Sequence, residues 1–69
     1  MTMLESGVYQ RGDLVALNSS QGPIVRVVVE DLGRVVEICR KEELQAAKDQ
    51  MRKPFTIGFL KSDIIKRMD

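Results

Sequence analysis

Short stretches of alternating apolar and polar residues dominate the first 40 positions of the chain. Residues 13–18, 24–31 and 34–40 carry aliphatic side chains at every second position, and turn-forming residues separate them at 18–23 and 31–33. A period of two is typical of strands, because successive side chains on a strand point to opposite faces of a sheet. The pattern therefore predicts three strands joined by tight turns.

The alternation also predicts which face of each strand lies toward the core. We expect a buried face made of Val15 and Leu17 in the first strand, Val25, Val27 and Val29 in the second, and Val36 and Ile38 in the third. This phase places Ile24, Val28 and Val35 on the outer face, with Cys39 beside them.

Residues 41–52 have a different character. They are rich in helix-forming residues and contain no β-branched side chain. Leu44, Ala47 and Met51 follow one another at helical spacing, which predicts a short helix with one apolar stripe. A mobile loop is the alternative, because a helix of this length needs to dock on the rest of the domain.

The last third of the chain returns to the strand pattern. Residues 55–60 predict a fourth strand, with Phe55, Ile57 and Phe59 on one face, and residues 64–67 predict a short closing strand. Four to five short strands indicate a single mainly β domain, either a small barrel or a sandwich, over about residues 8–67. Residues 1–7 are expected to form a frayed tail.

The run Gly12 to Leu17, the turn Gly22-Pro23 and the closing run Gly58 to Ile64 resemble a known family. They are similar to the YodC-like small bacterial proteins of unknown function, and more loosely to other SH3-like barrels. The resemblance covers roughly residues 11 to 65. It implies an all-β, SH3-like barrel, here with a helical insert near 41–52, and it implies no particular activity.

Composition limits the chemistry that the chain can perform. It has 69 residues, no histidine and a single cysteine, so an internal disulfide is excluded and a structural zinc site is not expected. No glycine-rich phosphate-binding motif is present, and Cys39 has no histidine with which to form a nucleophilic pair. We therefore expect no catalytic, metal or cofactor site, and no small-molecule substrate is evident. The free cysteine, the lack of a signal sequence and the lack of a long apolar run indicate a cytoplasmic protein.

Small size and the apolar outer face favour a module that binds protein and self-associates. A domain of 69 residues has a small core, and association is one way to stabilise it. The candidate interface consists of Ile24, Val28, Val35, Leu44 and Met51. The alternative is that the chain's own helix covers the outer apolar residues.

A nucleic-acid-binding surface is the second functional hypothesis. Residues 52–67 hold five basic side chains and one acidic one, so a basic face could form from Arg52, Lys53, Lys61, Lys66 and Arg67. The net charge of +1 is low for such a protein. Moreover, only three aromatic residues are present, and Phe55 and Phe59 are expected in the core.

Overall fold

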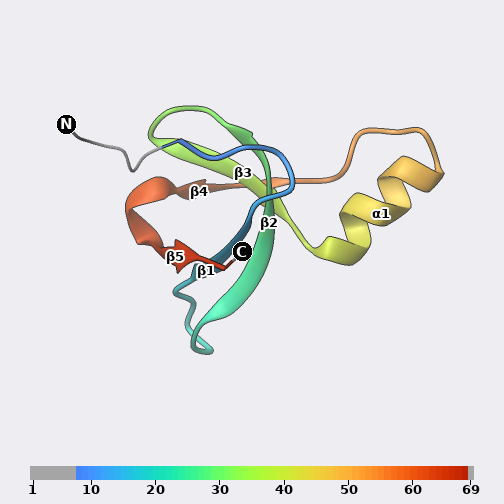
Figure 1. Ribbon diagram of the computed structural model, residues 1–69. Coiled ribbons are helices and arrows are strands. Elements are labelled where there is room, and N and C mark those ends of the chain that lie inside the picture. The colour runs from blue at the N-terminus through green and yellow to red at the C-terminus, as the bar shows by residue number, and fades with distance from the viewer. Residues whose placement is uncertain (1–7, 69) are drawn as a thin grey trace.

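The computed structural model describes residues 8–68, so the predicted tail at 1–7 lies outside the described residues. One short helix interrupts a series of five strands (Figure 1). The elements are β1 (Leu14–Leu17), β2 (Ile24–Asp31), β3 (Val35–Cys39), α1 (Lys41–Asp49), β4 (Ile57–Leu60), a 3₁₀ turn (Lys61–Asp63) and β5 (Ile64–Arg67). The predictions of a mainly β domain and of a helical insert are therefore confirmed.

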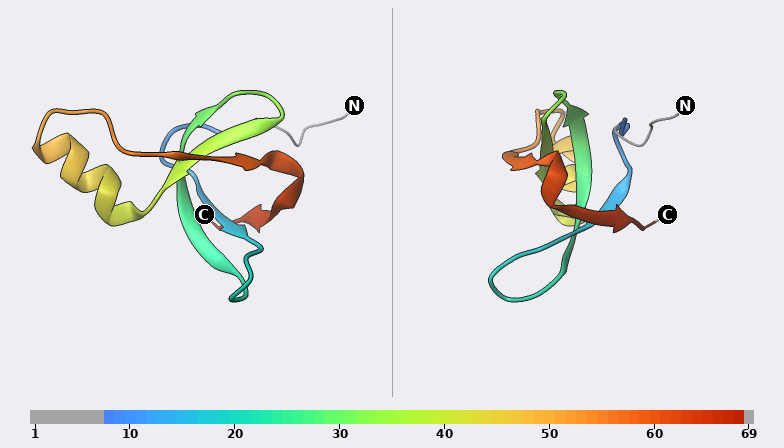
Figure 2. Two further views of the ribbon diagram at one scale, coloured as in Figure 1. Left: turned by 180° about the vertical axis from the view of Figure 1, so that it is seen from behind. Right: turned by 90° about the vertical axis from the view of Figure 1, so that its left-hand side faces the viewer.

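All five strands belong to one antiparallel sheet in the order β4-β3-β2-β1-β5. The two edge strands, β4 and β5, are consecutive in the chain, and the 3₁₀ turn connects them. The sheet is strongly bent, and α1 extends from one end of it (Figure 2). Gly33 adopts a φ of 102° in the turn between β2 and β3, a backbone conformation that favours glycine. Closure into an SH3-like barrel stays a prediction.

The core lies on one face of this sheet. Val15, Leu17, Val28, Val36 and Ile38 are almost fully buried there, and Tyr9, Ile24, Phe59 and Ile64 pack against them. The predicted core faces of β1 and β3 are therefore correct.

The predicted phase of β2 is wrong. Val28 is completely buried in the core, whereas Val25 is 43% exposed. A register shift between Val28 and Glu30 places an extra residue, Val29, opposite β3, so that the alternation changes phase within the strand. Val27 is also buried, so apolar residues line both faces of β2 and the pattern alone does not identify the core side.

Helix α1 covers part of the outer face. Val27 and Cys39, which are register partners on β2 and β3, are buried there, and Ala47 of the helix is 1% exposed. Leu44 is half-buried and lines a hollow together with Leu14 and Val27. The predicted stripe ends before Met51, which follows the helix with a φ of 53° and is 94% exposed. Met51 therefore does not belong to the part of the helical stripe that packs on the sheet.

Candidate interaction site at the edge of strand β4

Within residues 8–68, strand β4 has a neighbouring strand on one side only, which is β3. The amide of Lys61 donates a hydrogen bond to the carbonyl of Arg34 at 2.8 Å, and the ladder from this pair runs through Val35↔Leu60 to Ile38↔Ile57. Hydrogen-bonded and non-hydrogen-bonded pairs alternate along an antiparallel ladder. The amide and carbonyl of Gly58, and the amide of Leu60, therefore point away from β3 toward the open edge.

Apolar side chains accompany these open backbone groups. Phe55 is 78% exposed, Ile57 is 64% exposed and Leu60 is 54% exposed. Natural proteins commonly protect edge strands with charged residues. The other edge strand, β5, carries Lys66 and Arg67, but residues 55–60 contain no charged side chain. The edge of β4 is thus the less protected edge of the sheet.

The expectation that Phe55 belongs to the core is wrong, because a carboxylate holds it at the surface. Glu43 of α1 accepts a hydrogen bond from the amide of Phe55 at 2.9 Å and pairs with Arg52 at 2.6 Å. The Arg52 guanidinium also lies 5.0 Å from the centre of the Phe55 ring. The hydrogen bonds from Arg52 and from the Phe55 amide lower the pKa of Glu43, so this carboxyl stays ionised at neutral pH.

A hollow of about 370 Å³ lies beside these residues. Arg26, Ile38, Cys39, Arg40, Glu43, Phe55 and Ile57 line it. Arg26 is the register partner of the core residue Val15 and so lies on the core face of β2. At this end of the sheet the core face therefore opens into a surface that combines apolar and cationic groups.

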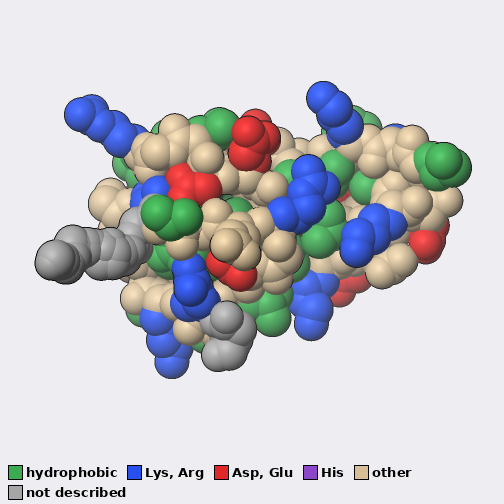
Figure 3. All heavy atoms as spheres, turned by 45° about the horizontal axis from the view of Figure 1, so that its top comes forward, with side chains coloured by type: hydrophobic (Ala, Val, Ile, Leu, Met, Phe, Trp, Pro, Cys, Tyr) green, Lys and Arg blue, Asp and Glu red, His purple; other side chains and the backbone are tan. Residues whose placement is uncertain are grey.

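Most of the basic side chains around this hollow lack an acidic partner. Arg26 and Arg40 line this hollow, and Lys41 lines an adjoining one with them. Among residues 8–68 these three side chains form no ion pair, and Arg26 bonds only to the carbonyl of Val25. Lysine and arginine side chains border apolar atoms between the sheet and the helical end of the molecule (Figure 3). We call Phe55, Ile57 and Leu60, together with Arg26, Arg40 and Lys41, the β4 edge site.

The predicted interface residues do not form one surface. Ile24 and Val28 face the core, so their outward placement is wrong. Val35 is half-buried on the outer face of β3, where its side chain leaves little room for a side chain at position 58. Leu44 lies on the helix and Met51 beyond its end.

The predicted basic residues likewise do not form one face, and three of them are bound to acidic partners. Arg52 is bound to Glu43, whereas Lys61 and Arg67 lie 5.8 and 5.0 Å from the centre of the Tyr9 ring. Lys61 pairs with Asp31, and Arg67 lies 3.5 Å from Asp13. Lys53 and Lys66 are exposed.

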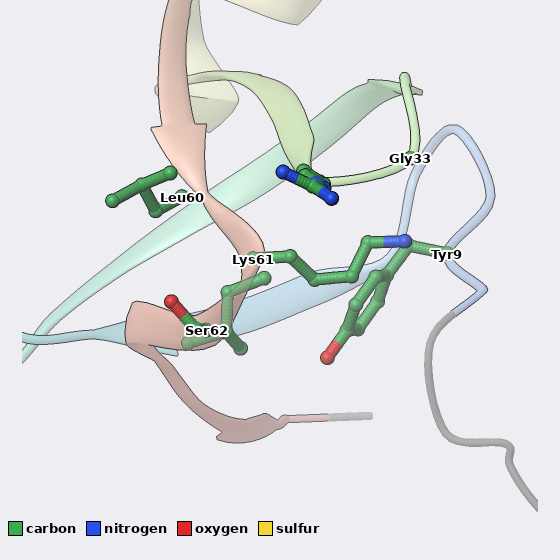
Figure 4. A pocket seen from close by; sticks show the side chains of 7 residues that line it. Tyr9, Gly33, Leu60, Lys61 and Ser62 are labelled. Carbon is green, nitrogen blue, oxygen red and sulfur yellow. The ribbon is translucent and has the colours of Figure 1, made fainter.

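A second hollow, of about 590 Å³, lies between Tyr9 and the 3₁₀ turn (Figure 4). Asp31 supports its wall by accepting hydrogen bonds from the amides of Tyr9 and Gly33 and from Lys61. Burial raises the pKa of Asp31, but these three hydrogen bonds outweigh burial and the net shift is downward. Two cations line this hollow: Lys61 pairs with Asp31, whereas Arg34 forms no ion pair within residues 8–68.

The thiol of Cys39 has a structural environment. It is buried beside α1, and burial followed by the charge of Glu43 raises its pKa. A raised pKa disfavours the reactive thiolate. Residues 8–68 contain no group of three or more acidic, cysteine or histidine side chains placed to hold a metal ion.

Sequence reasoning missed Phe55, Ile57, Arg26 and Arg40 as members of one site. The available signal was the uncharged run 55–60 in a strand next to a helical insert. The position of β4 at the edge of the sheet could not be predicted from the sequence. That position depends on pairing with β3 between residues that lie 19 to 25 positions apart in the chain.

Comparison of the chain with known protein families, with curated proteins and with solved structures found no match. The resemblance to YodC-like proteins stays a prediction. Within the described part of the chain, no helix is long and apolar enough to cross a membrane.

Proposed function

We propose that this chain is a non-catalytic interaction module that binds protein through the β4 edge site. The observation that carries the proposal is an edge strand with open backbone groups and with Phe55 and Ile57 exposed at 78% and 64%. Exposed apolar groups on an uncharged edge strand favour strand pairing with another chain. A cytoplasmic location and self-association, both expected from the sequence, are part of this proposal.

The test follows the backbone amides of the full-length, ¹⁵N-labelled protein by NMR. One series raises the protein concentration from micromolar to millimolar, and a second adds short extended peptides that are acidic, uncharged or basic. The proposal expects amides of residues 55–60 to shift in at least one series. Unchanged amides in both series would overturn it.

Nucleic-acid binding is a second candidate because Phe55 is exposed rather than buried. Exposed aromatic rings stack on the bases of single-stranded nucleic acids, and arginines without an acidic partner attract the phosphate backbone. Fluorescence anisotropy with labelled single- and double-stranded oligonucleotides, at low and moderate salt, tests this candidate. Binding that weakens steeply with salt and is lost in Phe55→Ala would support it. No binding at low salt would exclude it.

A further inference from the structure

We infer that the β4 edge site takes an acidic, extended polypeptide segment, which adds to the sheet as a sixth strand alongside β4. This inference rests on the proposed function and specifies the partner of the same site. Three features of the site carry it: its backbone groups, its charges and the composition of β4 itself.

The open backbone groups select a polypeptide in extended form. Gly58 directs both its amide and its carbonyl to the free edge, and Leu60 directs its amide there, as the β3–β4 register requires. A peptide strand can pair with these groups, whereas a nucleic acid offers no matching main-chain ladder. Added strands gain affinity from such pairing and specificity from alternate side chains.

The unpaired charges select an acidic segment. Arg26 and Arg40 line the hollow beside Phe55 and Ile57, and Lys41 lines an adjoining hollow with the same two arginines. Only Glu42 and Glu43 oppose them there, and Glu43 is already bound to Arg52 and to the Phe55 amide. Acidic side chains of an added strand would supply the missing partners.

A second copy of the chain fits this site less well. Residues 51–62, which include all of β4, contain no acidic residue. Edge-to-edge pairing of two β4 strands would therefore bring no carboxylate from the paired strand to the basic residues. An acidic segment satisfies the backbone groups and the charges together.

The experiment compares three seven-residue peptides in which valine alternates with glutamate, threonine or lysine. Binding to the full-length chain is measured by NMR shifts of the amides of Gly58 and Leu60. We expect the glutamate peptide to bind about tenfold more tightly than the threonine peptide, because each exposed ion pair contributes modestly, and the lysine peptide not to bind.

The role of the two arginines is tested with the double variant Arg26→Gln/Arg40→Gln. We expect it to lose about three- to tenfold in affinity for the glutamate peptide and to bind the threonine peptide unchanged. The control, Lys48→Gln/Lys66→Gln, changes the net charge equally at exposed positions that line neither of the two hollows that Arg26 and Arg40 line. Equal losses in both double variants would overturn the assignment of the charges.

The role of the outward-pointing backbone amide is tested at Leu60. Its φ of −65° matches proline, so Leu60→Pro removes the outward amide without disturbing the hydrogen-bonded pairs to β3. Leu60→Ala removes the side chain but keeps that amide. We expect the proline variant to lose at least about tenfold more affinity than the alanine variant, since it loses a strand hydrogen bond and introduces a ring at the contact.

The outcomes separate the inference from the proposed function. If the threonine and glutamate peptides bind equally, or if only protein concentration shifts residues 55–60, the function stands and the acidic partner is wrong. If oligonucleotides shift these amides and no polypeptide does, both are wrong. If neither peptides, oligonucleotides nor a second copy shifts them, both are likewise wrong.

Discussion

The ammonium group of Lys61 lies 2.8 Å from the carboxylate of Asp31, and both side chains are mostly shielded from water. Asp31 ends β2, whereas Lys61 begins the 3₁₀ turn that joins the two edge strands. The same carboxylate accepts hydrogen bonds from the amides of Tyr9 and Gly33. One acidic side chain therefore ties together the segment before β1, the β2–β3 turn and the link between β4 and β5.

Replacing Asp31 by asparagine should destabilise the fold. Asp31→Asn removes the charge that faces Lys61, and hydrogen bonds to charged groups contribute about 1.5–3 kcal/mol, so we expect a loss of about 1–3 kcal/mol in the free energy of unfolding. Urea denaturation at neutral pH measures this loss. Asp63→Asn, at an exposed position, serves as the control and should have little effect. Equal stability of the two variants would contradict the role given to Asp31.

The contribution of Asp31 should also depend on pH in a defined direction. Its pKa in the folded protein lies below the ordinary value of 3.8, so the folded state favours the ionised carboxylate. The stabilisation is present above the unfolded pKa and is lost as the pH falls through the lowered folded pKa. Unfolding free energies of the native protein and of Asp31→Asn should therefore converge in strong acid, and a constant gap would contradict this reasoning.

The corrected phase of β2 can be tested with two matched substitutions. Val28→Thr places a hydroxyl in the core and should cost about 1–3 kcal/mol in unfolding free energy. Val25→Thr makes the same change at a 43% exposed position and should stay within about 0.5 kcal/mol of the native protein. Chemical denaturation of both variants gives the comparison, and the opposite order would restore the sequence-based phase.

The same strand explains how far the fold could be read from the sequence. The alternation in β1 and β3 predicts Val15, Leu17, Val36 and Ile38 as core residues, and all four are buried. In β2, apolar residues occur on both faces, because one face packs against α1 and the other packs in the core. A bulge at Val29 then changes its phase. Local pattern determines the element, whereas tertiary packing determines which face is buried.

The site was less predictable than the fold for a related reason. Composition marked residues 52–67 as basic, but the ion partners that divide this region, Glu43 and Asp31, come from α1 and β2. Exposure of Phe55 follows from its attachment to Glu43, which is 12 positions away in the chain. A contact of that kind cannot be predicted from the pattern of apolar residues in either segment.

The attachment of Phe55 to Glu43 gives a further prediction. Glu43→Gln weakens the charged hydrogen bonds to Arg52 and to the Phe55 amide, so hydrogen exchange at that amide should become faster. Glu42→Gln, one position away and exposed, should leave it unchanged. Acidification should speed exchange relative to an unstructured reference peptide, but only when the pH falls through the lowered pKa of Glu43. Unaltered exchange in Glu43→Gln would show that the loop is held in another way.

Cys39 should behave as a structural residue. Its burial and raised pKa predict slow reaction with a thiol-specific disulfide reagent in the folded protein and fast reaction in urea. The rate in native buffer should follow the rate of opening of the fold, so Val28→Thr should react faster than Val25→Thr. Rapid, complete reaction of the native protein would contradict the buried position beneath α1.

The two edge strands offer a matched test of the β4 edge site. Ile57→Lys and Ile65→Lys each place a charge at an exposed isoleucine, at 64% and 47% exposure, one on β4 and the other on β5. A lysine on an edge strand opposes pairing with another chain. Sedimentation velocity and titration with the uncharged threonine peptide should therefore show that association or peptide binding is lost in Ile57→Lys and retained in Ile65→Lys. Because neither position lies in the buried core, both variants should keep native amide dispersion. Equal binding by the two variants would move the interaction away from β4, and loss in Ile65→Lys alone would assign it to the opposite edge of the sheet.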